Sequence, residues 1–386
     1  MEYLKVKEFA EVVTGGTPST DVKEYWENGT IPWIQSGSCK DKVINKADRY
    51  ITDKGLKNSS AKLMPKDTVV IALTGATAGK IGLLNIETSA NQSVTGILPN
   101  KKCTPLYLFY YLISIREKIL SDCYGGAQKH ISQGYVKDLL IPIPELTLQK
   151  KIVSKISKIS EMIAIKNKQL IKFDKLVKSQ FVEMFKGKNT PDYTKKIEEL
   201  CSEMMIGPFG SALHKDEIST SGDVFVLGTD NAVENFFSKK EIRYIDNNKY
   251  QQLKKYTVKP DDIIISMMGT IGRTAVIPND LEPAIISSHL CCLTPDKSKI
   301  YPDFLQKEFV LDDGVLYQIH SNKKGAIMSG LNLGIIKNIT IHYPDLNKQK
   351  EFLNIVKQID KQKFEFEKQL KKLEELQASL MQEYFG

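Results

Sequence analysis

Apolar residues recur at alternating steps of three and four along two long stretches of the chain, residues 149–187 and 349–386. This seven-residue spacing predicts two amphipathic helices whose apolar stripes pack against a partner helix. Lys166 interrupts the first stripe, and Lys363 and Gln377 interrupt the second. The residues predicted to form the helix–helix contact are Ile152, Ile156, Ile159, Ile163, Leu170, Phe173 and Val177 in the first helix, and Phe352, Val356, Ile359, Phe366, Leu370, Leu373 and Leu380 in the second.

The two helical stretches are copies of one another at an offset of 200 residues. Each follows a proline and a candidate N-cap, Thr147 or Asn347, and each reaches a glycine, which suits a helix end. A helix of this length spans roughly 55 Å at 1.5 Å per residue, which is longer than one domain requires. We therefore expect the copies to pack against each other as an antiparallel coiled coil that serves as a spacer.

The repeat also includes the regions ahead of each helix. A turn with proline and aspartate leads into a β-branched strand that ends at a glycine, and a second strand then closes at a proline. A helix, a glycine- and lysine-rich loop and a short apolar strand follow in both copies. The matching stretches are residues 64–75 and 258–269, 90–99 and 286–295, 105–120 and 302–317, 125–130 and 322–325, and 136–144 and 336–344.

The predicted fold class is α+β, with two repeated α/β domains separated by two long helices and related by a pseudo-twofold. Residues 14–60 and 206–255 differ much more between the copies than the rest does, so one scaffold carries two different faces. Two faces suit a protein that binds two different things. The predicted divisions are a first domain at 1–147, a central long helix at 148–188, a second domain at 189–346 and a C-terminal long helix at 347–386.

Composition adds limits on location and chemistry. The chain has 386 residues and a formal net charge of +8, and residues 149–188 carry 11 basic and 3 acidic side chains. A basic excess on one helix fits nucleic acid binding, and it fits a solvated helix face equally well. The six cysteines show no metal-binding spacing, and no apolar run is long enough to span a membrane. We expect a reduced, cytoplasmic protein in which Cys291 and Cys292 lie in a buried strand, with no bound metal.

Few motifs indicate catalysis. Residues 74–80 (Thr-Gly-Ala-Thr-Ala-Gly-Lys) resemble a phosphate loop, but only three residues separate the glycines and Ile81 stands where the magnesium-binding hydroxyl belongs. The repeat copy at 269–273 is shorter still. We interpret both as glycine hairpin turns with basic tips, and keep nucleotide hydrolysis as an alternative function. The five histidines form no zinc-hydrolase pair, and no nucleophile elbow appears. The chain is expected to bind rather than to catalyse.

Polar and basic side chains on the repeated loops are the candidate DNA contacts. Arg, Lys, Gln, Asn and His side chains read base edges and hold phosphates, and glycine-rich loops offer backbone amides and hydroxyls. The repetition of such loops in both halves, rather than any single residue, favours DNA. The candidates are Thr17, Ser19, Lys80, Gln92, Gln128, Lys129 and His130 in the first half, and Ser211, Lys215, Arg273, Lys323 and Lys324 in the second.

The chain resembles, over essentially its whole length, the DNA specificity (S) subunits of type I restriction-modification systems. The first half carries the more specific motifs, and the second half matches them more weakly. In the first half these are residues 14–19, 25–26, 28–34, 51–60, 74–80, 91–92 and 141–144; in the second half they are 207–211 and 337–344.

The resemblance implies that residues 1–147 and 189–346 are target recognition domains, each reading one half of a bipartite asymmetric DNA sequence. The long helices would set the half-site spacing and dock two methyltransferase (M) subunits; restriction (R) subunits would join them. S-adenosylmethionine, ATP and magnesium would belong to those partners, and this chain would carry no cofactor. Residues 189–345 hold 17 basic and 21 acidic side chains, so we expect the M subunits to supply much of the phosphate contact there. A further alternative is a coiled-coil adaptor whose globular parts bind protein.

Overall fold

The computed structural model describes residues 2–122, 130–187, 194–209, 212–321 and 330–386. It divides into two compact units. The first comprises Met1–Lys168 with Glu367–Gly386, and the second comprises Gln169–Phe366. Each unit therefore includes half of each long helix together with one globular part, so the helices are shared by the units rather than standing apart from them.

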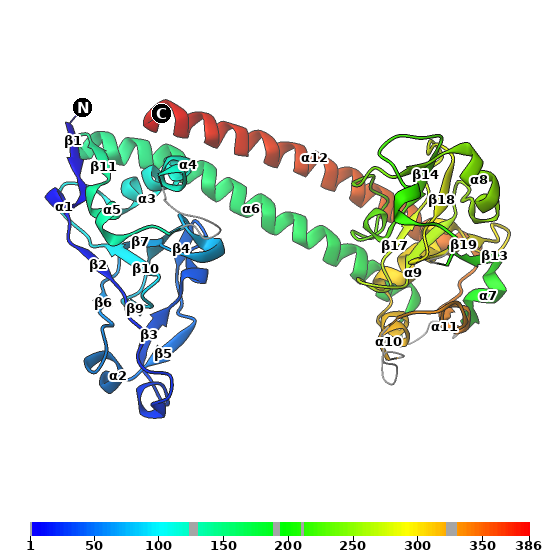
Figure 1. Cartoon of the computed structure of the whole chain (residues 1–386), viewed down its shortest axis with the longest axis horizontal. Helices are drawn as coiled ribbons and strands as arrows, with labels where there is room; N and C mark the ends of the chain where they lie inside the picture. The colour runs from blue at the N-terminus through cyan, green and yellow to red at the C-terminus, as the bar shows by residue number, and fades with distance from the viewer. Residues whose placement is uncertain (1, 123–129, 188–193, 210–211, 322–329) are drawn as a thin grey trace. The chain divides into compact units, whose positions relative to one another are not determined.

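The first unit is built on two sheets joined by short connections (Figure 1). A five-stranded sheet has the order β2-β10-β7-β8-β4 and a four-stranded sheet has the order β5-β3-β9-β6, while β1 pairs with β11. Its elements are β1 (Glu2–Lys5), α1 (Val6–Phe9), β2 (Val12–Thr14), β3 (Ile31–Ile34), β4 (Lys42–Ile44), β5 (Arg49–Ile51), α2 (Asp53–Lys57), β6 (Leu63–Met64), β7 (Val69–Ala72), β8 (Ile81–Leu84), β9 (Thr88–Ala90), β10 (Val94–Ile97), α3 (Pro105–Ser114), α4 (Arg116–Ser121), α5 (Gln133–Asp138), β11 (Leu140–Ile143) and the first part of α6 (Leu146–Phe185).

The second unit repeats this plan. Its sheets have the orders β13-β19-β16-β17 and β15-β14-β18, and β12 pairs with β20. Its elements are β12 (Thr194–Lys196), α7 (Ile197–Leu200), β13 (Cys201–Ile206), β14 (Val224–Leu227), β15 (Tyr244–Ile245), α8 (Asn247–Leu253), β16 (Ile263–Ser266), β17 (Thr274–Val276), β18 (Ala284–Ile286), β19 (Leu290–Pro295), α9 (Pro302–Leu311), α10 (Asp313–Ser321), α11 (Leu333–Asn338), β20 (Thr340–His342) and the first part of α12 (Leu346–Phe385). The predicted α+β fold with a duplicated domain is thus confirmed.

The two long helices run antiparallel within each unit. In the first, Lys155 near the start of α6 bonds the hydroxyl of Tyr384 near the end of α12 at 2.7 Å. In the second, the rings of Phe181 and Phe352 lie 5.6 Å apart, so the end of α6 packs on the start of α12. The antiparallel helix pair predicted from the heptad spacing is confirmed.

The residues predicted to form the helix–helix contact, called the seam below, are all buried or partly buried, and exposed residues lie between them along each helix. Ile152, Ile156, Val356 and Ile359 belong to the cores of the globular parts, so the seam is continuous with each core. The interrupting Lys363 reaches Asp174 across the helix pair at 2.7 Å, and Lys166 bonds Gln369 at 2.6 Å. The helix ends are thereby anchored to cores, and cross-helix contacts such as these join the helices nearer their middle.

Several expected boundaries are wrong. The helices begin at Leu146 and Leu346, so Thr147 and Asn347 lie inside them and do not cap them. Asp345 instead accepts bonds from the N–H groups of Asn347 and Lys348 at 3.0 Å. The single helices expected at 105–120 and 302–317 are each two helices, broken at Ile115 and at Asp312.

The strands expected at 90–99 and 286–295 are also each two strands. In the first unit β9 pairs in the four-stranded sheet, and β10 pairs in the five-stranded one. Residues 91–93 connect them, and residues 287–289 make the same connection from β18 to β19. The chain thus switches sheets at both of these connections. Cys291 and Cys292 lie buried in β19, as expected.

Candidate nucleic-acid interface

In the first unit, three loops meet where the chain passes from one sheet to the other. After β2, the N–H of Gly15 donates to Val94 O at 3.0 Å, and that of Gly16 donates to Ala90 O at 2.8 Å. After β7, the N–H of Leu73 donates to Ser93 O at 2.8 Å. The 91–93 connection is therefore held between the other two loops by backbone hydrogen bonds.

This junction brings Thr17, Ser19 and Gln92 together. The Thr17 hydroxyl donates to Oε1 of Gln92 at 2.5 Å, and all three residues are exposed. The two members of the pair lie 75 positions apart in the chain. Hydroxyl and amide groups placed side by side on a rigid loop can accept and donate hydrogen bonds to base edges or phosphates.

Two tryptophans fix the loop that carries Thr17 and Ser19. Nε1 of buried Trp33 donates to Gly16 O at 3.1 Å, and Nε1 of Trp26 donates to Ser19 O at 3.0 Å. The rings of Trp26 and Trp33 pack edge to face with centroids 5.1 Å apart. Both ends of the loop are thus hydrogen-bonded to one edge-to-face aromatic pair, which restricts its movement.

Glycine is required at the start of this loop. A Cβ on Gly15 would lie 2.2 Å from the carbonyl oxygen of Ala90. The repeat has the same constraint, because a Cβ on Gly207 would lie 2.0 Å from the carbonyl oxygen of Ser287. Both loops therefore use glycine for close approach of two backbones rather than for a left-handed turn.

The second unit builds the same junction with other side chains. The N–H of Gly207 donates to Leu290 O at 3.1 Å, and that of Met267 donates to His289 O at 2.9 Å. At the position equivalent to Thr17 stands Phe209, which is 72% exposed. The connection between its sheets presents His289, which is exposed, at its end. The scaffold is repeated, while the groups it presents differ.

The glycine-rich turns are hairpins, as the sequence suggested. Residues 74–80 connect β7 to β8, which pair antiparallel, and Gly75 and Gly79 have φ near 75°. A phosphate loop opens a helix, whereas this turn opens a strand. Lys80 extends to Asp41, with 3.1 Å between Nζ and Oδ2. Asp41 also pairs with Arg116, so Lys80 is held in a structural ion-pair cluster beside the turn.

The other candidates fall in separate places. His130 forms an isolated bridge with Thr74 beside the glycine turn, and its side chain is exposed. Arg273 follows the equivalent turn of the second unit and is exposed. Lys215 is exposed and begins a 3₁₀ turn, Lys215–Glu217. Gln128, Lys129, Ser211, Lys323 and Lys324 lie outside the described residues.

The sequence reading did not include Arg49 among the candidates. Its guanidinium carbon lies 4.0 Å from the ring centre of Trp26, beside the Thr17 loop. The triplet Arg49-Tyr-Ile recurs as Arg243-Tyr-Ile in the second unit, where Tyr244 and Ile245 form β15. That recurrence is the signal that could have identified the position.

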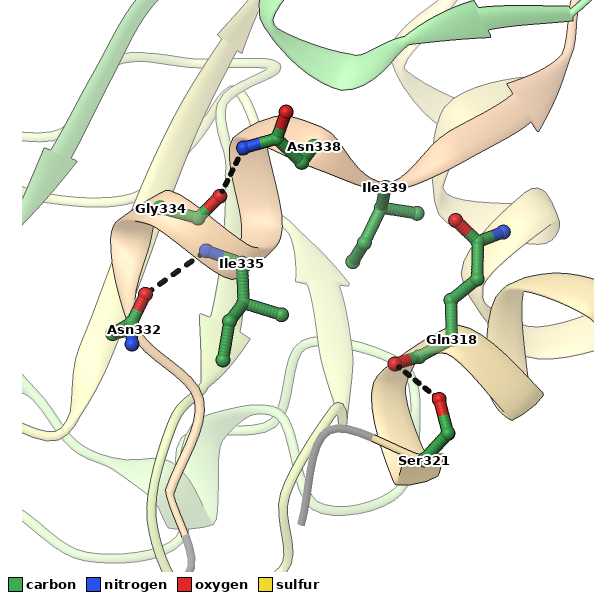
Figure 2. A pocket seen from close by; sticks show the side chains of 7 residues that line it. All are labelled: Gln318, Ser321, Asn332, Gly334, Ile335, Asn338 and Ile339. Atoms are coloured by element: carbon green, nitrogen blue, oxygen red, sulfur yellow. Dashed lines mark hydrogen bonds between the residues drawn. The ribbon is translucent and has the colours of Figure 1, made fainter. Parts of the chain in front are cut away.

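A cavity of about 400 Å³ lies between α10 and α11 in the second unit (Figure 2). It is lined by Gln318, Ser321, Asn332, Gly334, Ile335, Asn338 and Ile339. Asn332 Oδ1 accepts the N–H of Ile335 at 2.9 Å, which caps α11. None of these described lining residues has an acidic or basic side chain, so they offer no acid or base for chemistry.

No cluster of three His, Cys, Asp or Glu side chains in the described part of the chain is placed to hold a metal ion. No helix within the described ranges has the length and apolar character needed to cross a bilayer.

Two copies of one scaffold, each presenting its own hydroxyl, amide, aromatic and guanidinium groups at a sheet junction, define a duplicated recognition protein. The chain belongs to the type I restriction modification DNA specificity family, whose domain model matches residues 1–173 and 194–377.

Related proteins support this assignment. The MjaVIII type I restriction enzyme specificity subunit of Methanocaldococcus jannaschii is 25% identical over 96% of this chain and 90% of its own length. The MjaIX specificity subunit of the same organism is 30% identical, but the match spans 47% of this chain and only 42% of that subunit. The match to the EcoR124I/EcoR124II specificity subunit of Escherichia coli, at 27% identity, spans 40% of that protein. The chain thus spans less than half the length of these last two relatives.

Solved structures share the fold. A chain from a study of complex assembly and conformational transition of the type I R-M system superposes with a TM-score of 0.63 at 16% identity, covering 100% of this chain and 97% of that one. The S subunit from M. genitalium gives 0.56 at 15% identity, covering 100% and 96%. At these identities the likeness concerns the fold alone.

Proposed function

We propose that this chain is the non-catalytic DNA-recognition subunit of a type I restriction-modification complex and reads a bipartite asymmetric target. The observation that best supports this proposal is that the same junction between sheets occurs in both units. The backbone junction of Gly15 with Ala90 recurs at Gly207 with Ser287, yet Thr17 in one unit is replaced by Phe209 in the other. One scaffold with two different contact faces suits two different half-sites.

Domain exchange tests this function. Residues 1–147 are replaced by the first domain of another family member, and methylated bases are mapped in cells that express the chimera with its methyltransferase. One half of the methylated motif changes and the other stays the same. A change in both halves contradicts the assignment of one domain to one half-site. Exchange of residues 189–346 is the matched control and changes the opposite half.

We further propose that methyltransferase subunits dock on the long helices and that restriction subunits join them. Exposed apolar side chains on α6 support a helical partner, because water disfavours such groups on a solvated helix. They are Met162, Ile165, Ile171, Leu176 and Val182, each at least 43% exposed. S-adenosylmethionine, ATP and magnesium would act in those subunits. The complex would work on DNA in the cytoplasm.

The long helices would set the distance between half-sites. Because α6 and α12 pair along their length, seven residues are inserted into both, after Lys168 and after Phe366, to preserve the seam. Seven helical residues add about 10.5 Å, or about three base pairs of spacer. Mapped methylation shows unchanged half-sites with a longer spacer. An unchanged spacer in a complex that still methylates would contradict the role of the helices as a ruler.

A further inference from the structure

Each unit carries a basic residue at two equivalent positions. The first position is the arginine of the Arg-Tyr-Ile triplet, which begins edge strand β5 at Arg49 and directly precedes edge strand β15 at Arg243. These strands pair antiparallel with β3 and β14, and Ile51 faces Ile31 as Ile245 faces Val224. The second position follows the glycine turn, at Lys80 and Arg273. The pairing partners of these four residues differ between the units.

In the first unit, the arginine at the edge-strand position is free to bind a ligand. Arg49 is exposed, stacks on Trp26, and has no carboxylate partner among the residues that the structure describes. The neighbouring Asp48 instead accepts bonds from the N–H of Gln35 and the hydroxyl of Ser38. Lys80, at the turn position, is paired with Asp41.

In the second unit the situation is reversed. Arg243 is ion-paired with Asp230 and, at 2.7 Å, with Glu241, and its Nε donates to Val226 O at 3.3 Å. Only 22% of its side chain is exposed. Arg273 at the turn is exposed, and no described carboxylate pairs with it. Each unit therefore holds one of these two basic residues in an ion pair and leaves a guanidinium with no carboxylate partner among the described residues, at opposite positions of the repeat.

We propose that Arg49 in the first domain and Arg273 in the second are DNA-backbone contacts, each holding one phosphate. This inference rests on the proposed DNA-recognition function. A guanidinium without a carboxylate partner retains its full charge and its forked donors for a phosphate. Stacking on Trp26 orients the fork of Arg49 beside the Thr17 loop without neutralising it.

The recurrence of the Arg-Tyr-Ile triplet in both domains favours a contact with a DNA phosphate over a contact with a base. A side chain that reads a base belongs to the face that differs between the domains, whereas Arg-Tyr-Ile is shared by both. A phosphate is present at every sequence, so a scaffold residue can hold it whatever the half-site. The change of position from one domain to the other then reflects only which of the equivalent basic residues forms no ion pair with a described carboxylate.

Salt dependence of binding tests the proposal. The complex of this chain with its methyltransferase subunits is titrated with a DNA duplex that carries the motif mapped by methylation sequencing. The same titration is made with a scrambled duplex, and both are repeated over a range of salt concentrations. Each lost phosphate contact makes the slope of log K against log salt shallower by about 0.9. Arg49→Gln and Arg273→Gln each show this change, the double variant shows about twice it, and the methylated motif stays unchanged.

Two matched variants complete the design. Arg243→Gln stands at the same repeat position as Arg49 but lacks a free charge, so it leaves the slope at the wild-type value. Arg49→Lys keeps the charge and restores most of the slope, and it covers the case in which Arg49→Gln folds poorly.

An unchanged slope in folded Arg49→Gln, or a relaxed base preference in its methylated motif, overturns the phosphate assignment. So does an equal loss in Arg243→Gln. A wild-type complex that fails to prefer the mapped duplex over the scrambled one would instead overturn the proposed function itself.

Discussion

Oε1 of Gln149 accepts a hydrogen bond from the backbone N–H of Thr104 at 2.8 Å, which ties the start of α6 to the start of α3. Its Nε2 donates to Lys102 O and Pro144 O at 2.8 and 2.9 Å. Gln349 makes the same three bonds in the second unit, accepting from Tyr301 and donating to Lys299 and Pro344. Both side chains are fully buried, so the long helix is fixed to its domain in the same way in each copy.

Replacing this glutamine destabilises the domain that it holds. Gln149→Met keeps the volume but leaves one N–H and two carbonyl groups without their side-chain partner. An unsatisfied buried polar group costs about 1–3 kcal/mol, so the free energy of unfolding falls by at least about 2 kcal/mol. Urea denaturation measures it, and Gln349→Met gives a similar loss. The exposed Gln358→Met serves as control. A loss of less than 0.5 kcal/mol, as surface substitutions give, would contradict the clamp.

The aromatic contact at the end of α6 is the next test. Phe185 is 1% exposed and packs against Phe304 and Phe352 with centroids 5.2 and 5.5 Å away. Phe185→Ala therefore costs about 3–5 kcal/mol. The equivalent Phe385 is only partly buried against Tyr107 and Tyr111, so Phe385→Ala costs less. Equal losses in urea denaturation would contradict this ranking.

The sequence predicted those features of the fold that depend on periodicity and repetition. The heptad stripe located both helices to within a few residues because burial of α6 and α12 follows their own spacing. The sequence-based prediction was wrong where the pairing of strands far apart in the chain decides the structure. Residues 90–99 were predicted to be one strand that closes at a proline, yet the chain switches sheets at residues 91–93 because β9 pairs with β3 and β10 pairs with β2. No local pattern records which strand will be the neighbour.

The same limit applies to the candidate contacts. Lys80 and Arg273 look equivalent in the sequence, but Asp41 lies 39 residues from Lys80, and only the fold brings them together. Arg49 and Arg243 share a triplet, while Asp230 and Glu241 engage one of them and Trp26 the other. Whether a charge is available to DNA depends on such tertiary neighbours, which single-sequence reasoning does not supply.

Gly15→Ala is predicted to impair recognition of one half-site. The added Cβ would meet the Ala90 carbonyl at 2.2 Å, so the loop must move and separate Thr17 from Gln92. Affinity of the complex for the mapped duplex falls about tenfold or more, which corresponds to a loss of about 1.4 kcal/mol or more of positioned contacts. Gly37→Ala is the control, because nothing lies within 4 Å of its Cβ. Binding equal to wild type in Gly15→Ala would show that the loop takes no part in recognition.

Lys363→Leu is predicted to stabilise the second unit. Lys363 is a half-buried seam position, and its partner Asp174 has a side chain that is 67% exposed. Such a surface ion pair contributes about 0–1 kcal/mol, whereas burying an apolar side chain gives about 1.5–3 kcal/mol when complete. The thermal midpoint therefore rises, while Lys361→Leu on the exposed face changes it little. A lowered midpoint would mean that the ion pair contributes more than the apolar contact that replaces it.

Glu308 makes the stability of the second unit depend on pH. It is fully buried on α9, and neither carboxylate oxygen has a hydrogen-bond partner among the described residues. Burial, and then the negative charge of Asp312, raises the pKa of Glu308 well above its ordinary value, against the opposing effect of Lys186. Lys186 is itself paired with Asp312 at 2.6 Å. At the equivalent position the first unit has Tyr111, whose hydroxyl donates to Leu140 O at 3.1 Å.

The direction of the pH effect follows from this raised pKa. The folded chain holds the Glu308 proton at pH values where the unfolded chain has lost it, so folding takes up a proton there. The contribution of Glu308 to the free energy of unfolding is therefore greatest below its ordinary pKa in the unfolded chain. It is lost as pH rises from that value through the raised pKa of the folded chain. In Glu308→Gln that fall is absent, and the thermal midpoint at alkaline pH exceeds that of the wild type. Glu351→Gln, an exposed carboxylate of α12, keeps the wild-type pH profile. If Glu308→Gln retained the same decline with pH, the buried carboxyl would not be its source.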